Sequence, residues 1–209
     1  AGVIGGEKPL GLCGSGLIDL VSELLRTGCI DRSGRFVPDA AGHRLRYDGG
    51  QAELVVVPGS ATALGRDIVI TEADIASFIR AKGAIYTAAE ALLRHTGLDF
   101  TDVQHVYVAG GFGNYLDVRK AIRIGLLPDL PIERFQFIGN GSLQGAKMAL
   151  LSRQALEVME KRIAPNMTHF ELSTDPQFMN EYTGSLFLPH TNIEKFPSVE
   201  REQSRISVR

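Results

Sequence analysis

The chain has 209 residues, of which 44% are hydrophobic and 22% are charged, and its formal net charge at pH 7 is -2. This balance gives no electrostatic reason to expect binding to nucleic acid or to a membrane surface. No apolar run approaches the roughly 20 residues that a membrane-spanning helix needs. The opening "AGVIGGEKPLG" has neither the charged region nor the apolar region of a signal peptide.

The sequence contains two cysteines, Cys13 and Cys29. Their spacing, with no histidine nearby, matches no zinc or iron–sulfur pattern, so no metal site is expected. Cys13 precedes a glycine at an expected helix start, a position that favours a thiolate. We nevertheless expect both cysteines to be buried, reduced and structural, which favours a cytoplasmic protein.

The first half of the chain predicts one short helix, two strands and one long helix. Apolar residues at helical spacing predict a helix that opens within "GLCGSGLID" and ends at Gly28. Residues 31–51 lack a sustained period and predict a loop with short strands at its ends. "ELVVVP" and "RDIVIT" predict two strands separated by a turn. A capping-box pattern that begins at Thr71 predicts a long helix to about Thr96, stopped by Gly97.

The second half alternates strands and helices. It predicts, in order, a strand at 105–109, a helix at 115–126, a strand in "FQFIG", one long helix in "SLQGAKMALLSRQALEVMEKRI" before Pro165, a strand at 168–172 and a helix from about Pro176 to Leu186. Beyond Pro189 the chain turns polar, and we expect it to wrap the surface or to fray. The alternation predicts an α/β layered fold with a mostly parallel or mixed sheet.

Small residues cluster beside an expected helix start in "GLCGSGLID", "VAGGFGNYLD" and "FIGNGSLQGA". A helix N-terminus offers unpaired N–H groups that favour anions, and glycines let a ligand approach the backbone. Each junction also has a purely structural interpretation. Gly-Gly-Phe-Gly can be a tight strand-to-helix turn, Gly-Ser-Gly can serve close helix packing with Ser15 as N-cap, and the third can be a turn capped by Ser142.

Lys82 interrupts the apolar face of the long helix. Its side chain would either snorkel to solvent or reach a nucleotide. The sequence contains no Walker A pattern and no Gly-x-Gly-x-x-Gly motif that opens a βαβ unit. The five histidines share no motif with serine or cysteine, and solvation of the helix surface accounts for Asp19. We therefore expect no self-sufficient hydrolase and no catalytic residue in this chain.

Four ordered segments, "GLCGSGLIDLVSELLRTGCID", "AKGAIYTAAEALL", "VYVAGGFGNYLD…AIRIGLLP" and "GNGSLQGAKMALLS", together resemble the C-terminal half of the reductive activators of corrinoid proteins. That family lies within the superfamily of acetate and sugar kinases, Hsp70 and actin. The resemblance extends from about residue 4 to residue 190. It implies a ribonuclease-H-like or actin-like ATPase (ASKHA) fold, a mixed sheet flanked by helices. Only the C-terminal part of that fold would be present, in residues 1–189, with a polar tail at 190–209.

The resemblance also implies a nucleotide site. "VYVAGGFGN" would be the adenosine motif, with its glycines beneath the ribose and adenine, and the "GLCGSGLID" and "GNGSLQGAKMALL" segments would be two connecting helices between lobes. The residues implied to bind ATP or its adenosine are Gly110, Gly111, Phe112, Gly113, Asn114, Lys82, Gly14, Ser15, Gly16 and Asn140.

Other regions that the resemblance implies for the family's proteins do not occur in these 209 residues. The ferredoxin-like N-terminal region would carry a [2Fe-2S] cluster on four cysteines, and the phosphate-binding motifs and Mg²⁺ ligands would lie upstream. We therefore expect the chain to be the C-terminal part of a longer protein and not to be catalytic alone, and the resemblance implies a homodimer. The resemblance implies that the parent is an ATPase coupled to electron transfer, which helps reduce a cobalt(II) corrinoid to cobalt(I) on a methyltransferase-associated corrinoid protein.

Two other functions stay open on the sequence alone. A small-molecule kinase of the same superfamily would need a catalytic aspartate and phosphate loops. A scaffold or dimerisation module would keep the fold without binding nucleotide.

Overall fold

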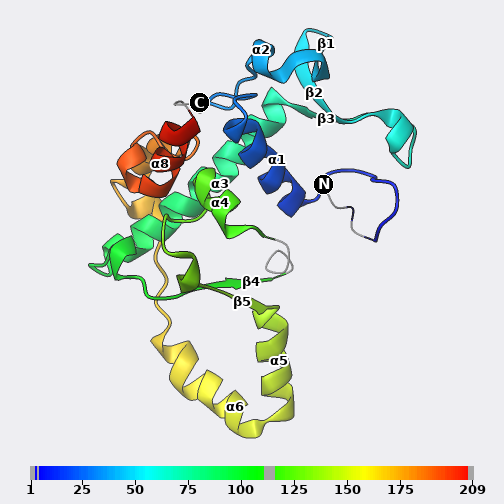
Figure 1. The fold of residues 1–209 in the computed structure, drawn as a ribbon. Coiled ribbons are helices and arrows are strands. Elements are labelled where there is room, and N and C mark those ends of the chain that lie inside the picture. The colour runs from blue at the N-terminus through cyan, green and yellow to red at the C-terminus, as the bar shows by residue number, and fades with distance from the viewer. Residues whose placement is uncertain (1–2, 4, 111–115, 207–209) are drawn as a thin grey trace.

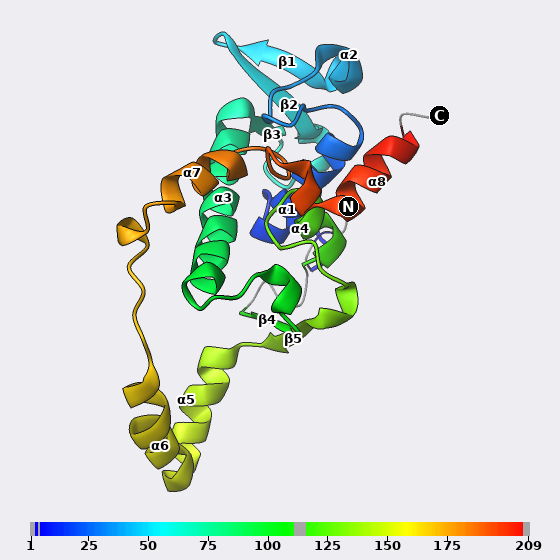
Figure 2. The ribbon, with the colours of Figure 1, turned by 90° about the vertical axis from the view of Figure 1, so that its left-hand side faces the viewer.

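The structure, a computed structural model, describes residues 3, 5–110 and 116–206, with side chains up to Glu202 in the last helix (Figure 1). The predicted site residues Gly111, Phe112, Gly113 and Asn114 lie outside this range. Two clusters of buried side chains form the body of the molecule. A helical hairpin stands away from this body in both views (Figures 1 and 2).

Helix α1 (Gly14–Arg26) turns Ile18, Val21 and Leu24 into the first cluster. Its N-cap is Cys13, whose Sγ accepts a hydrogen bond from the Gly16 backbone N–H at 3.4 Å. The interpretation of Ser15 as the N-cap is therefore wrong. The predicted stop is confirmed, because Gly28 follows the helix with φ +72°, a left-handed conformation that suits glycine.

Three strands form an antiparallel sheet in the order β1-β2-β3, with β1 at Leu45–Asp48, β2 at Gln51–Val57 and β3 at Ile68–Thr71. The single helical turn α2 (Pro38–Ala41) precedes them. Both strands predicted from "ELVVVP" and "RDIVIT" are confirmed. Of the short strands expected at the two ends of the 31–51 region, β1 is present near its end, and its start carries a single β-bridge between Ile30 and Phe36. Leu54 and Ile70 face the first cluster.

Helix α3 (Glu72–His95) crosses the whole body and contributes to both clusters. Its predicted capping box is confirmed, since Thr71 accepts from the Asp74 N–H and the Asp74 carboxylate accepts from the Thr71 N–H. Gly97 follows its end with φ +75°. Local capping chemistry thus fixes both ends of this helix.

Strands β4 (Val106–Ala109) and β5 (Phe135–Gly139) pair in parallel, and α4 (Val118–Arg123) lies in the crossover between them. The helix predicted at 115–126 is shorter, because Asp117 caps it and Gly125, at φ +75°, follows its end. Among the described residues the strands form two separate sheets, one antiparallel and one parallel, so the predicted single sheet of mixed strands is not observed.

The long helix predicted before Pro165 is divided. Helix α5 (Gly141–Leu151) ends at Ser152, whose extended backbone (φ -137°, ψ 113°) interrupts the helix and whose hydroxyl caps α6 (Arg153–Val158). A π-helical turn, Met159–Ile163, continues from α6. The two helices form a hairpin in place of one rod (Figure 2).

The C-terminal region differs from the prediction in two places. Residues 168–172 form no strand, because no neighbouring strand offers them a backbone partner within the described residues. Helix α7 (Phe178–Ser185) agrees with the prediction. The chain beyond Pro189 does not stay on the surface, because Phe196 (0% exposed) and Val199 (3%) enter the second cluster ahead of and within α8 (Pro197–Ile206). The predicted boundary between a domain at 1–189 and a C-terminal tail at 190–209 remains a prediction.

Candidate functional site

Two of the three glycine junctions meet at one edge of the parallel sheet. The Gly110 N–H, just past the end of β4, donates to the carbonyl oxygen of Gly139, the last residue of β5, at 2.7 Å. Both glycines have positive φ (+97° and +67°), and no heavy atom of the described residues lies within 4 Å of where a Cβ would stand. Their backbones are therefore open to an approaching ligand. Ligands of α/β folds bind at this carboxyl end of parallel strands.

Asn140 directly follows this edge and is the N-cap of α5. Its side-chain oxygen accepts from the Leu143 N–H at 3.0 Å, so the cap is Asn140 and the interpretation of Ser142 as the cap is wrong. A Cβ on Gly141 would lie 3.8 Å from the Ala109 Cβ. The first turn of α5 thus stands directly over the end of β4, which keeps Asn140 beside the glycine edge.

The first glycine junction lies on a different feature, an apolar pocket of about 300 Å³ between α1 and α3. Gly14 and the stem of Lys82 both line it, and so does Leu116, the first described residue after the segment 111–115. The lining residues are Gly14, Leu17, Ile18, Phe78, Ala81, Lys82, Ile85, Leu116 and Leu126. In the sequence, Gly110 of the glycine edge and Leu116 of the pocket are the described residues that border the segment 111–115.

Ser15 and Gly16 belong to the first turn of α1, beside an exposed thiol. The Ser15 hydroxyl lies 3.4 Å from Cys13 Sγ, and this hydrogen bond, with the Gly16 N–H, lowers the pKa of the Cys13 thiol. Cys13 is exposed and Cys29 is half-buried, and both are free, so the prediction that they are buried is wrong. The cause is the end-on position of Cys13 at the helix start, where nothing in the described residues covers it.

Lys82 is the largest fully buried side chain of the described residues, at 1% exposure. Its Nζ donates to the carbonyl oxygens of Phe187 and Pro189, each at 2.5 Å. Burial lowers the pKa of Lys82 to about 7. The expectation that it snorkels to solvent is wrong, since the amine ends inside the protein. Its stem reaches the apolar pocket while its amine holds the backbone of residues 187–191.

A second cation holds the same segment, residues 187–191, which we call the strap. Arg32 Nε donates to the Leu188 carbonyl at 3.2 Å, and Arg32 Nη2 donates to the His190 carbonyl. The Leu188 N–H returns a bond to the Arg32 carbonyl at 2.8 Å. A Cβ on Gly125 would stand only 2.1 Å from the Pro189 oxygen, so glycine is required for the strap to pass.

His190, within the strap, carries a buried polar atom without a partner. Its Nδ1 accepts from the Asn192 N–H at 3.0 Å, whereas its Nε2 is buried and has no hydrogen-bond partner among the described residues. Burial lowers the pKa of His190 to about 4, and the positive charges of Lys195 and Lys82 act in the same direction. The imidazole is therefore neutral near pH 7, which the low dielectric around it requires.

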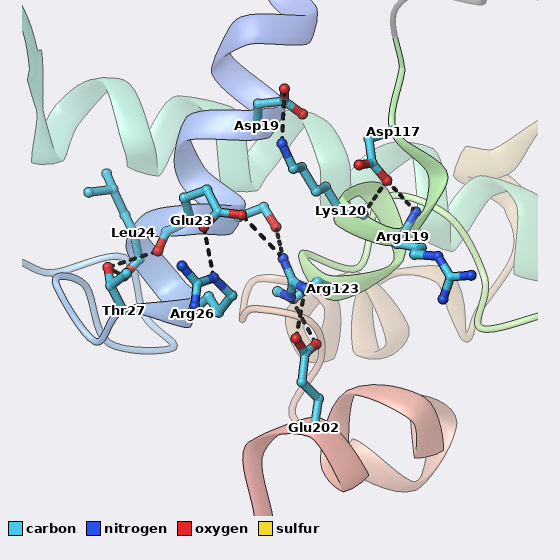
Figure 3. A network of polar contacts seen from close by, with 11 residues as sticks. Asp19, Glu23, Leu24, Arg26, Thr27, Asp117, Arg119, Lys120, Arg123 and Glu202 are labelled. Atoms are coloured by element: carbon cyan, nitrogen blue, oxygen red, sulfur yellow. Dashed lines mark hydrogen bonds and ion pairs between the residues drawn. The ribbon is translucent and has the colours of Figure 1, made fainter. Parts of the chain in front are cut away.

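Helices α1, α4 and α8 are joined by a network of ion pairs (Figure 3). Arg123 binds Glu202 through two hydrogen bonds of 3.0 and 2.8 Å and also donates to the Ser22 hydroxyl at 2.9 Å. Lys120 pairs with Asp19 at 3.1 Å, so solvation alone does not account for Asp19. Bidentate arginine–carboxylate geometry fixes α8 against the body.

Sequence reasoning missed the strap and the residues that hold it. Arg32 lies in a polar loop, and Phe187 to His190 follow a short helix without any motif. The one relevant signal in the sequence is the position of Lys82 within the apolar face of a helix, which indicates that its amine needs a partner elsewhere in the fold. The described residues contain no group of three or more His, Cys, Asp or Glu side chains that could hold a metal ion. In the same part of the chain, every helix is too short or too polar to cross a membrane.

The described residues thus combine a parallel strand pair and its glycine edge with a long helix before it and a helix that begins at that edge. The sequence model of the family described as the C-terminal domain of RACo, the ASKHA domain, matches residues 1–200. The chain therefore belongs to this family, and both the resemblance and the fold class are confirmed.

Known relatives agree. The chain is similar to the corrinoid activation enzyme RamQ of Eubacterium limosum, with 37% identity over 86% of this chain and 31% of the relative. It is also similar to the [Co(II) methylated amine-specific corrinoid protein] reductase of Methanosarcina barkeri, with 29% identity over 85% of this chain and 29% of the relative. A solved structure of a reductive activator for corrinoid, iron-sulfur protein matches 94% of this chain and 31% of its own, with 45% identity and a TM-score of 0.89. The chain thus spans about a third of the length of these relatives.

Proposed function

We propose that this chain is the nucleotide-binding C-terminal part of an ATP-dependent reductive activator. The complete protein would help reduce a cobalt(II) corrinoid to cobalt(I) on a methyltransferase-associated corrinoid protein. The names of the relatives support this reading, since they are corrinoid activators or reductases. The single structural observation that carries it is the open edge at which the Gly110 N–H meets the Gly139 carbonyl.

The described residues fit the adenosine part of a nucleotide. The open backbone at Gly110 and Gly139 would let a ribose or a base lie against the strand ends, and Asn140 would stand beside it. The apolar pocket that Gly14 and Lys82 line offers flat hydrocarbon surface of the kind that a base covers. Lys82 would act there through its stem, because its amine is held by the strap. Ser15 and Gly16 would contribute through the N-terminal turn of α1.

ATP binding would supply the free energy that favours a closed arrangement of the two lobes, a shift limited by its differential affinity for the two states. This chain would contribute the adenosine contact and rigid helices that transmit closure. The Mg²⁺ and phosphate ligands and a [2Fe-2S] cluster would reside in the remaining two thirds of the protein. A cytoplasmic location, suggested by the two free cysteines, and a homodimer belong to the same proposal.

Membership in the RACo family favours this function over a small-molecule kinase. A scaffold that kept the fold without nucleotide binding makes a different prediction, and one titration separates the two. The scaffold hypothesis predicts that the complete protein has no affinity for ATP.

The test is calorimetric titration of the full-length protein with ATP and ADP, with Gly110→Val as the variant. A valine at φ +97° would strain the backbone and fill the open space beside Gly139. We expect at least a tenfold loss of ATP affinity, about 1.4 kcal/mol or more.

Gly50→Val is the matched control, because Gly50 has φ +84° and equally open surroundings but lies in the turn between β1 and β2. It would suffer similar strain and should bind ATP as the parent does. Absence of ATP binding by the unsubstituted full-length protein would refute the proposal and leave the scaffold. Equal losses of ATP affinity in the two variants would show that the glycine edge is not part of the nucleotide site.

A further inference from the structure

Two cations share the backbone of the strap, which follows α7 and leads toward α8 (Figure 2). Along residues 187–190, successive carbonyl oxygens accept alternately from Lys82 and from Arg32. The Leu188 N–H also donates to the Arg32 carbonyl oxygen at 2.8 Å. Hydrogen bonds from charged donors are stronger than bonds between neutral groups. The position of the strap therefore depends on both side chains together.

The strap also adjoins the apolar pocket between α1 and α3. The stem of Lys82 lines this pocket, while its amine leaves the pocket to reach the strap. A second contact lies at the turn after α4, where the Pro189 oxygen stands 2.1 Å from the place of a Cβ on Gly125. Leu126, the next residue, lines the pocket as well. A shift of the strap would therefore reach the pocket by two routes.

Arg32 has no direct contact of this kind. It is half-buried in the loop between α1 and α2, and it is not among the residues that line the pocket. A lysine on an apolar wall extends its amine toward water when nothing holds it, because its stem has several freely rotating bonds. The Lys82 stem stays in place because the strap holds the amine, and the strap in turn needs the donors of Arg32, since half-buried carbonyl oxygens without donors are unfavourable.

On the premise of the proposed function, that a nucleotide occupies this pocket, we infer that Arg32 is a positioning residue of the nucleotide site. Arg32 fixes two carbonyl oxygens of the strap, the strap fixes the amine of Lys82, and the fixed stem of Lys82 shapes the wall on which the base lies. A nucleotide that uses this wall binds more tightly when the strap is docked. By linkage, its binding favours the docked strap to the same extent.

The first test is calorimetric titration of the full-length Arg32→Ala variant with ATP. We expect at least a roughly fivefold loss of affinity, the lower end of usual coupling between sites. Arg32→Lys should recover part of this loss, because it keeps a cation but lacks the planar fork that reaches two carbonyl oxygens. Arg35→Ala, an exposed arginine in the same loop, should bind ATP within about twofold of the parent. Parent-like affinity of Arg32→Ala would overturn the inference.

A double-mutant cycle with Lys82→Met tests the route through the strap. Methionine keeps a flexible apolar stem for the pocket and removes the amine that the strap holds. If Arg32 and Lys82 act through one strap, the double variant should lose about as much ATP affinity as the more damaging single variant. Losses that multiply would show that the two side chains act separately, and would overturn the inference.

Hydrogen exchange of the unsubstituted full-length protein tests the same coupling and gives a result even where Arg32→Ala fails to fold. The Leu188 N–H donates to the Arg32 carbonyl oxygen and the Thr191 N–H to that of Gly184, so both amides report opening of the strap. Saturating ATP should slow their exchange at least about fivefold. The Leu98 N–H, bonded at the end of α3, should exchange at an unchanged rate. Strap exchange that ignores ATP would overturn the inference.

The inference and the proposed function can be told apart in these experiments. Absence of ATP binding by the unsubstituted full-length protein would refute the proposed function, and the inference that rests on it would fall too. ATP binding that is indifferent to Arg32→Ala and leaves strap exchange unchanged would refute the inference alone and keep the nucleotide site.

Discussion

The strap and the hairpin differ in how far they pack against the rest of this chain. The strap, residues 187–191, has little to mark it in the sequence, yet Leu188 is fully buried and two cations bind its carbonyl oxygens. The hairpin of α5 and α6 is rich in apolar residues and is predicted from the sequence as one long helix, yet none of its residues is buried. Apolar content alone therefore does not decide burial.

The difference lies in what each segment meets. The strap passes between α3 and α4, where Lys82, Arg32 and Gly125 provide donors and space for its backbone. The hairpin leaves the body at β5, and beyond the first turn of α5 its two helices pack mainly on each other among the described residues (Figure 2). The strap belongs to a core that this chain completes, whereas the hairpin contributes no buried side chain to that core.

The largest effect should come from truncating a buried side chain beyond the strap. Phe196→Ala removes a ring that is 0% exposed and packs at 5.4 Å, centroid to centroid, from Tyr86. We expect a loss of about 3–5 kcal/mol in the free energy of unfolding of the 209-residue chain, measured by urea denaturation. Leu150→Ala should change it by less than about 0.5 kcal/mol in the same chain. A small effect of Phe196→Ala would break the comparison, because the C-terminal region would then be a surface tail.

The next effect concerns the backbone of the strap. Arg32→Ala leaves the carbonyl oxygens of Leu188 and His190 without their donor in a half-buried place. We expect a loss of about 2–3 kcal/mol in the free energy of unfolding. Arg35→Ala, an exposed arginine in the same loop, should stay within about 0.5 kcal/mol of the parent. Similar losses in both variants would show that the loop matters only through its general charge.

Acid should weaken the strap through His190. Its pKa in the folded protein is about 4, below the ordinary value of about 6.5 for an unfolded chain. The unfolded state binds more protons between these values, so stability is complete above about pH 6.5 and falls as the pH drops toward 4. We expect a loss of about 2–3 kcal/mol over this range, by urea denaturation at a series of pH values.

His190→Asn supplies the control for this titration, since its side-chain oxygen can still accept from the Asn192 N–H and it carries no titrating proton. The pH slope attributed to His190 should disappear in this variant. An unchanged slope would assign the acid sensitivity to another group, such as Glu181, whose pKa is lowered by its hydrogen bond to Lys195.

Features that depend on neighbouring residues could be predicted from the sequence. The capping box at Thr71 and the stop at Gly97 are set by local chemistry, and both are correctly predicted. The glycine junctions were identified, but their meeting through Gly110 and Gly139 depends on the crossover that brings two strands together.

Features that depend on distant residues could not be predicted. Lys82 was interpreted as solvent-seeking or nucleotide-bound because nothing near it in the sequence reveals the carbonyl oxygens of residues 187 and 189. The strand expected at 168–172 failed for the same reason, since a strand exists only beside a partner. The break at Ser152 is different, because a serine that caps a following helix is a local signal that apolar periodicity concealed.

The smallest predicted effect tests whether the hairpin depends on local contacts alone. Asn140→Ala removes the side-chain oxygen that accepts from the Leu143 N–H, and should cost about 1 kcal/mol of local stability in α5. Hydrogen exchange of the α5 amides in the 209-residue chain would measure it. Ser142→Ala is the matched control, since Ser142 is exposed within the same turn and alanine favours helix, so it should cost nothing. If Ser142→Ala destabilised α5 more than Asn140→Ala, the cap would be misassigned. The geometry at the glycine edge would then need another anchor.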